Sequence, residues 1–162
     1  MHPWIVFFHA LSVVLFLLAH GASHSVSLRI PSERKPERLR ALLELSTSGY
    51  TVMFGALALV FVFGIVAGFS GQWWGRGWIW ASLGLLLVVS AAMFWLAQRS
   101  YRPLRTALGL PTFSEEKPQQ AAAPASDDEI AALAAAARPL PNIIVGIGGL
   151  AVFMWLMLFK PF

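Results

Sequence analysis

The chain has 162 residues, of which 57% are hydrophobic and only 12% are charged, so its composition predicts an integral membrane protein. It has no cysteine, which excludes disulfides, thiolate metal sites and cysteine nucleophiles. The net charge of +4 comes from basic residues beside apolar stretches, which indicates the anionic leaflet of a bilayer as the partner and argues against nucleic acid.

The first apolar stretch, from Pro3 to Leu28, predicts a membrane-spanning helix. No Asp, Glu, Lys or Arg occurs from Pro3 to Ala19, a length that covers most of a hydrocarbon core at about 1.5 Å per residue. Because no basic segment comes before the apolar run, we expect it to be retained and not cleaved as a signal peptide.

All four histidines fall on one face of this predicted helix. At about 100° per residue, their imidazoles lie within an arc of about 60°, a face that Phe16 shares. An imidazole inside lipid is costly unless it is hydrogen-bonded or bound to a metal, so each of them is a candidate functional residue. The four are His2, His9, His20 and His24.

Haem b and copper are the cofactors that this pattern suits best. Two histidines on one helix face cannot bind opposite sides of one haem iron, so a bis-histidine site needs a second chain, whereas a methionine can complete a site internally. Matching the depths of the spans pairs His20 with Met53 and His9 with Met157. His20 and His24, four residues apart, can also chelate Cu(II), Ni(II) or Zn(II) by themselves.

Two other interpretations stay open at this point. The histidines can hydrogen-bond Ser12, Ser82, Ser90 or backbone atoms of neighbouring helices. In that case the chain fits an accessory subunit of a larger respiratory or photosynthetic membrane complex. No acidic residue falls inside a predicted span, so we expect a non-enzymatic role in redox chemistry or metal handling, and no acid–base catalysis.

The segment after Pro31 predicts a short interfacial helix over residues 36–46, with leucines on one side. A second span is expected from Ser48 to Phe69. Near its end, Gly64 and Gly68 form a G-x-x-x-G pair, which favours close packing with another helix. We expect that helix to belong to the same bundle, with a homodimer as the alternative.

The turn from Ser70 to Gly77 is short and predicts an antiparallel hairpin. Indole rings prefer the headgroup layer, so its tryptophans and its arginine are interpreted as a membrane-interface anchor. An aromatic rim for a quinone or another amphipathic ligand is the alternative. The residues of this aromatic turn are Trp73, Trp74, Arg76, Trp78 and Trp80.

A third span is expected from Trp78 to Gln98, followed by a flexible linker over residues 109–141. Within the linker, Ser126 and the acidic residues after it predict a capped helix over residues 127–137. The fourth span is expected from Asn142 to Phe159, within the last region of the chain, and its glycines give it a thin side for packing.

The distribution of basic residues predicts the orientation. Ten Lys and Arg residues follow the first and third spans, against Arg76 and Lys160 on the other side. Because positive loops stay in the cytoplasm, we expect an all-α antiparallel four-helix bundle in a bacterial cytoplasmic membrane with both termini outside. The ten are Arg29, Arg34, Lys35, Arg38, Arg40, Arg99, Arg102, Arg105, Lys117 and Arg138.

Three motifs carry a resemblance to a known group. They are Phe7-Phe8-His9-Ala10-Leu11-Ser12, the basic loop over residues 29–40, and Gly75-Arg76-Gly77-Trp78-Ile79-Trp80. Over roughly residues 5–110 the chain resembles predicted bacterial integral membrane proteins related to the copper-resistance D type. The resemblance implies a ligand early in the first span, at His9. This chain differs from the group in having four spans and no histidine on the later ones, so the resemblance does not imply a complete site within one chain.

Overall fold

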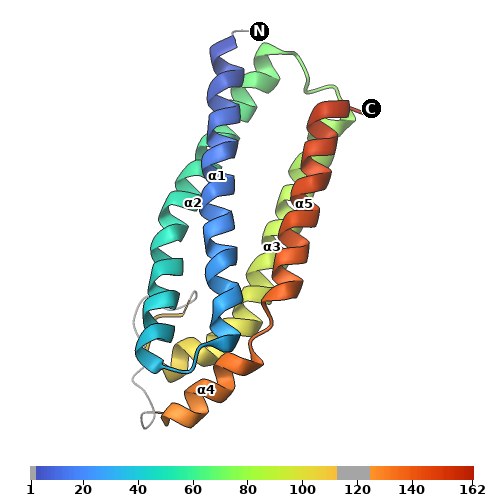
Figure 1. The fold of residues 1–162 in the computed structure, drawn as a ribbon. Helices are drawn as coiled ribbons and strands as arrows, with labels where there is room; N and C mark the ends of the chain where they lie inside the picture. The colour runs from blue at the N-terminus through green and yellow to red at the C-terminus, as the bar shows by residue number, and fades with distance from the viewer. Residues whose placement is uncertain (1–2, 113–124) are drawn as a thin grey trace.

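The computed structural model describes residues 3–112 and 125–162, and within these residues the chain is helical with no strand. Figure 1 shows four long helices, with both termini at one end and the short helix α4 at the other. We call the end that carries α4 the base. The elements are α1 (Pro3–Arg29), the short 3-10 helix η1 (Ile30–Ser32), α2 (Pro36–Ser70), α3 (Gly77–Ala107), α4 (Asp127–Ala136) and α5 (Pro139–Phe159).

The described part of the chain contains four helices that are long and apolar enough to cross a membrane. Much of their apolar surface is open, as at Leu87 and Leu158, each 72% exposed. An apolar surface of this extent is unusual for a protein that faces water on all sides. Length, composition and exposure therefore agree on a multi-pass membrane protein.

The prediction of a separate interfacial helix over residues 36–46 is wrong, because this segment is the first part of the continuous helix α2. Two hydroxyl side chains lie where the predicted segments meet: the Thr47 hydroxyl donates to the backbone oxygen of Leu43 and the Ser48 hydroxyl to that of Leu45, both at 2.9 Å. Hydroxyl groups that bond back to their own helix leave its hydrogen-bond ladder intact.

The helices around the linker also differ in extent from their predicted bounds. α3 continues past Gln98 to Ala107, and α5 begins at Pro139, where a proline costs no hydrogen bond because the first turn needs none. The capping pattern predicts α4 closely. It begins after Ser126, whose hydroxyl oxygen accepts a hydrogen bond from the backbone N–H of Glu129.

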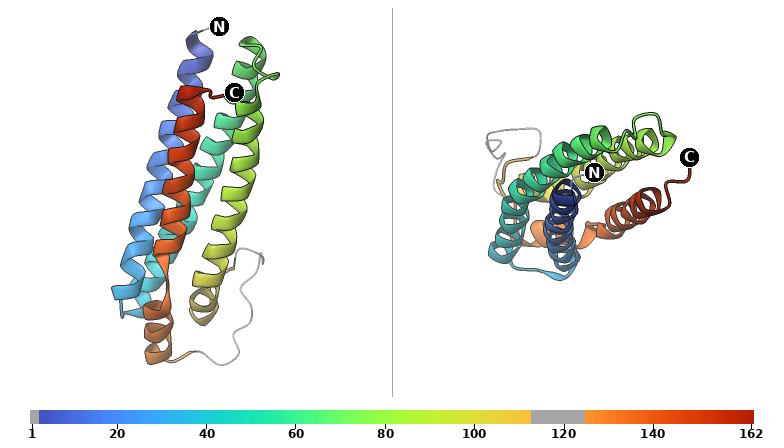
Figure 2. Two further views of the ribbon diagram at one scale, coloured as in Figure 1. Left: turned by 90° about the vertical axis from the view of Figure 1, so that its right-hand side faces the viewer. Right: turned by 90° about the horizontal axis from the view of Figure 1, so that it is seen from above.

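The long helices contact one another mainly as two pairs, α1 with α2 and α3 with α5. A smaller contact joins α1 to α5. Figures 1 and 2 show that α1 and α5 approach each other toward the base and diverge toward the end that carries the termini. The two pairs are therefore held together chiefly near the base.

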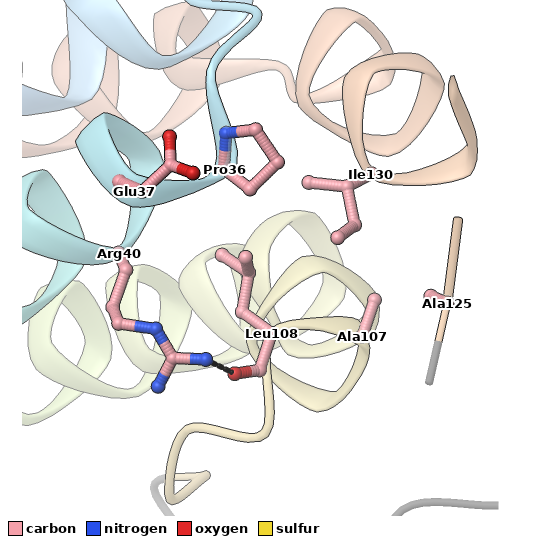
Figure 3. Close-up of a pocket in the computed structure, with 7 residues that line it drawn as sticks. All are labelled: Pro36, Glu37, Arg40, Ala107, Leu108, Ala125 and Ile130. Atoms are coloured by element: carbon pink, nitrogen blue, oxygen red, sulfur yellow. Dashed lines mark hydrogen bonds between the residues drawn. The ribbon is translucent and has the colours of Figure 1, made fainter. Parts of the chain in front are cut away.

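Two of the ten predicted basic residues, Arg105 and Arg40, donate hydrogen bonds to the chain where α3 ends. Arg105 is only 4% exposed, and its guanidinium donates to the backbone oxygen of Pro111 at 2.7 Å and to the Thr47 hydroxyl at 3.1 Å. The Arg40 guanidinium donates to the backbone oxygen of Leu108, the residue that caps α3 (Figure 3). Cations at the carboxyl end of a helix stabilise its unpaired carbonyl groups.

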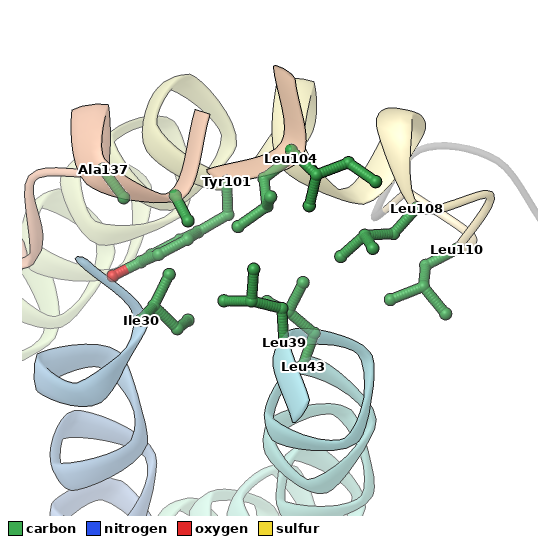
Figure 4. Close-up of a cluster of buried hydrophobic side chains, with 10 residues drawn as sticks. Ile30, Leu39, Leu43, Tyr101, Leu104, Leu108, Leu110 and Ala137 are labelled. Carbon is green, nitrogen blue, oxygen red and sulfur yellow. The ribbon is translucent and has the colours of Figure 1, made fainter. Parts of the chain in front are cut away.

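A cluster of buried hydrophobic residues joins η1, α2, α3 and α4 at the base (Figure 4). Leu39 of α2 and Leu104 of α3 are 0% exposed and lie at its centre. We call it the base cluster. Its members are Ile30, Leu39, Leu43, Tyr101, Leu104, Leu108, Leu110, Ile130, Ala134 and Ala137.

The contact between α3 and α5 supplies a test with a neighbouring control. A Cβ atom added at Gly149 would lie 2.8 Å from Cγ2 of Val89, whereas one added at Gly148 meets nothing within 4 Å. Because valine is stiff, we expect Gly149→Ala to force the helices apart and destabilise the protein by about 1–3 kcal/mol. We expect Gly148→Ala to be neutral or stabilising by up to about 1 kcal/mol. Unfolding in mixed detergent micelles measures both, and equal stability of the two variants would contradict the close packing.

Candidate metal centre

The structure divides the predicted histidine face between two neighbours. His2 lies outside the described residues. The ring of His9 faces α2, while the rings of His20 and His24 face α3 and α5. All three described imidazoles are half-buried. One face of α1 therefore presents two separate environments for imidazole.

His9 is fixed by a hydrogen bond to α2. Its Nδ1 atom lies 3.1 Å from the backbone oxygen of Val60. A carbonyl oxygen only accepts, so His9 donates Nδ1–H and a neutral ring keeps an unprotonated Nε2. A Cβ atom at Gly64 would lie 3.2 Å from Cε1 of His9, and one at Gly68 3.2 Å from the Trp74 ring. Both glycines of the predicted G-x-x-x-G pair thus face side chains of this same chain.

His20 and His24 form a pair one helical turn apart on α1. Their Nε2 atoms are 3.0 Å apart, so one imidazole donates its N–H to the other. The Phe16 ring stacks on His20, with ring centroids 5.3 Å apart and planes at 16°. If an ion were bound at about 2.0 Å from both nitrogens, the N–metal–N angle would be about 95°. Transition metals accept such an angle.

Met93 of α3 and Gly146 of α5 complete this neighbourhood. A Cβ atom built on Gly146 would lie 2.9 Å from Nε2 of His20, 3.1 Å from Nε2 of His24 and 3.1 Å from Cε of Met93. Two imidazole nitrogens and the end of a thioether side chain therefore converge on one point. Three helices meet there because Gly146 has no side chain. We call His20, His24 and Met93 the three-donor cluster.

Sequence reasoning missed Met93, although a signal for it exists. His20 lies about 26 Å along α1 from Pro3, and Met93 about 24 Å along α3 from Gly77, at 1.5 Å per residue. Both helices start at the same end of the molecule (Figure 1). Depth matching therefore pairs His20 with Met93 as well as with Met53.

The two methionines that the sequence offered as ligands are placed elsewhere. Met53 belongs to α2 and is half-buried, whereas the His20 ring is turned toward α3 and α5. Met157 belongs to α5 and is 41% exposed, whereas the His9 ring is turned toward α2. Of the three predicted serine partners, Ser12 and Ser82 donate their hydroxyl hydrogens to carbonyl groups of their own helices.

The aromatic turn is held together by the C-terminal residues. The Lys160 ammonium lies 4.4 Å from the ring centroid of Trp73 and 5.7 Å from that of Trp78. The indole N–H of Trp80 donates to the backbone oxygen of Trp74 at 3.0 Å. These contacts place the Lys160 ammonium against two ring faces. The membrane-interface anchor and the aromatic rim for a ligand both stay predictions. A small hollow here is lined by Trp73, Arg76, Trp78 and Lys160.

A larger hollow of about 350 Å³ lies at the base between α2, α3 and α4 (Figure 3). Its polar side chains are Glu37 and Arg40, and the guanidinium of Arg40 is already bonded to a carbonyl group. This lining offers less chemistry than the histidines do. Its described residues are Pro36, Glu37, Arg40, Ala107, Leu108, Ala125 and Ile130.

Across residues 3–112 and 125–162, no group of three or more His, Cys, Asp or Glu side chains is placed to hold a metal ion. Among these described residues, a third protein ligand beside the histidine pair would have to be of another residue type, such as methionine. No family model, curated protein or solved structure matches the chain.

The bond between His9 and Val60 makes a prediction about the tautomer of the ring. In the detergent-solubilised protein at neutral pH, long-range ¹H–¹⁵N spectra should show His9 with its proton on Nδ1, since a carbonyl oxygen lies 3.1 Å away. The signal is assigned by its loss in His9→Asn. A proton found on Nε2 would contradict the orientation described here.

Proposed function

We propose that this protein is a non-enzymatic copper-binding protein of the bacterial cytoplasmic membrane, and that His20 and His24 bind the ion. The observation that carries the proposal is the 3.0 Å distance between the two Nε2 atoms. Two imidazoles one turn apart chelate an ion from one side of a helix, and imidazole is a natural ligand of copper. The resemblance of residues 5–110 to proteins of the copper-resistance D type favours copper over other metals.

The placement of the ion follows from the orientation proposed for the helices. We place the base in the cytoplasm, because the segments that carry most of the basic residues meet there and positive loops stay inside. Four spans crossing in alternate directions then leave both termini outside. His20 lies about 26 Å along α1 from Pro3, in the cytoplasmic half of the bilayer.

The proposal predicts copper binding that depends on the pair. Purified in mild detergent, exposed to copper and then desalted, the protein should retain about one ion per chain by elemental analysis. His20→Ala and His24→Ala should each lose most of it, because a single imidazole holds copper weakly. His9→Ala is the matched control, since its ring faces α2, and should retain the ion. Copper that is retained equally by all variants, or bound by none of them, would overturn the proposal.

A second candidate, haem b ligated by His9, is favoured by one observation. A histidine that binds a metal commonly donates its other ring N–H to a backbone carbonyl, and His9 donates Nδ1–H to Val60, which keeps Nε2 for an iron. The second axial ligand would come from another copy of the chain or from a neighbouring subunit.

A visible spectrum of the protein as isolated separates the remaining candidates. A Soret band that disappears in His9→Ala would support haem. A colourless protein that co-purifies with a large respiratory or photosynthetic complex, and that binds no copper, would instead support the accessory-subunit role. Copper binding at the pair without a Soret band supports the first proposal.

A further inference from the structure

The arrangement around the histidine pair contains a third donor of a different chemical type. The reference point is the position that a Cβ atom on Gly146 would take. The terminal carbon of Met93 lies 3.1 Å from it, and the Nε2 atoms of His20 and His24 lie 2.9 Å and 3.1 Å from it. The sulfur is one bond away from that carbon. Methionine has three rotatable side-chain bonds, so rotation about them can direct the sulfur toward an ion between the nitrogens.

The ligand types of the three-donor cluster favour a soft ion. A thioether is a soft, uncharged donor that prefers Cu(I), whereas zinc sites in proteins use thiolate, imidazole and carboxylate ligands. Imidazole binds both classes of metal. Met93 is therefore the ligand that would make the site selective.

Electrostatics favours the same choice. The helices that carry the three donors and Gly146, namely α1, α3 and α5, contain no acidic residue. With neutral ligands, a bound ion keeps its full charge in a medium of low dielectric constant. The free energy of transferring an ion from water to such a medium rises with the square of its charge. For a divalent ion it is therefore about four times that for a monovalent ion. A site of this composition suits Cu(I) better than Cu(II) or Zn(II).

We propose that His20, His24 and Met93 form a three-coordinate Cu(I) site and that Gly146 leaves the space it occupies. This inference rests on the copper-binding function proposed above and adds the third ligand, the oxidation state and the role of the glycine. The two imidazoles come from α1, the thioether from α3 and the open space from α5. The ion therefore links the two helix pairs, which the smaller contact between α1 and α5 brings together.

The first test measures Cu(I) affinity by competition with a chromophoric Cu(I) chelator under anaerobic, reducing conditions. Met93→Leu keeps the size of the side chain and removes the sulfur, and we expect it to lower Cu(I) affinity about 10-fold or more while leaving Zn(II) affinity unchanged. Met53→Leu is the matched control, since Met53 is equally half-buried but lies on α2, and it should bind as the wild type does. X-ray absorption of the Cu(I) form should show a sulfur neighbour that Met93→Leu lacks.

The second test concerns the space at Gly146. A Cβ atom there falls within 3.1 Å of all three side chains, so we expect Gly146→Ala to lower Cu(I) affinity, whereas Gly148→Ala, which meets nothing within 4 Å, should leave it unchanged. Circular dichroism and gel filtration confirm that each variant is folded.

The outcomes separate this inference from the function on which it rests. If His20→Ala and His24→Ala lose copper while Met93→Leu binds Cu(I) like the wild type and no sulfur neighbour is detected, the third ligand is overturned and the copper-binding function stands. A loss of affinity in Met53→Leu would move the sulfur ligand to α2 and also overturn it. If the wild type binds neither Cu(I) nor Cu(II), both proposals are overturned.

Discussion

The packing of the base cluster is the contact on which the positions of the long helices depend. Leu39 and Leu104 are fully buried there, although most of the surface of the long helices is open. Because α1 pairs mainly with α2 and α3 mainly with α5, the base is the place where the first pair is held against the second. The cluster includes Ile30, which directly follows α1, and Ala137, which lies just before α5, so its burial holds the adjoining ends of these two helices at the base.

Glycines of neighbouring helices decide where each imidazole lies. His9 lies against Gly64 of α2, and the pair of His20 and His24 lies against Gly146 of α5. In both places a side chain as small as alanine would enter the space that the rings occupy. Small residues let helix backbones approach closely in an apolar medium, and here the space they leave is filled by polar rings. The same property that permits packing thus creates the two candidate sites.

The two sites differ in what they offer to a ligand. His9 presents one imidazole, whose Nδ1–H is hydrogen-bonded to the carbonyl group of Val60. A single imidazole suits a metal cofactor, such as haem, that itself supplies most of the ligands of its metal. The three-donor cluster presents several neutral donors within one chain, and no acidic residue stands on α1, α3 or α5. Its low charge is consistent with an apolar surrounding and favours ions of low charge. This contrast is why we propose copper for the pair and consider haem for His9.

The number of apolar helices and the cap of α4 at Ser126 could be predicted from the sequence, because each depends on local composition or on neighbouring residues. The continuity of α2 could not, since it depends on hydroxyl groups finding carbonyl groups of their own helix. The burial of Arg105 does not follow from spacing along the chain, and spacing alone does not choose between Met53 and Met93 as the neighbour of His20. Those depend on how each helix is rotated and tilted against its neighbours, which only the packed tertiary structure decides.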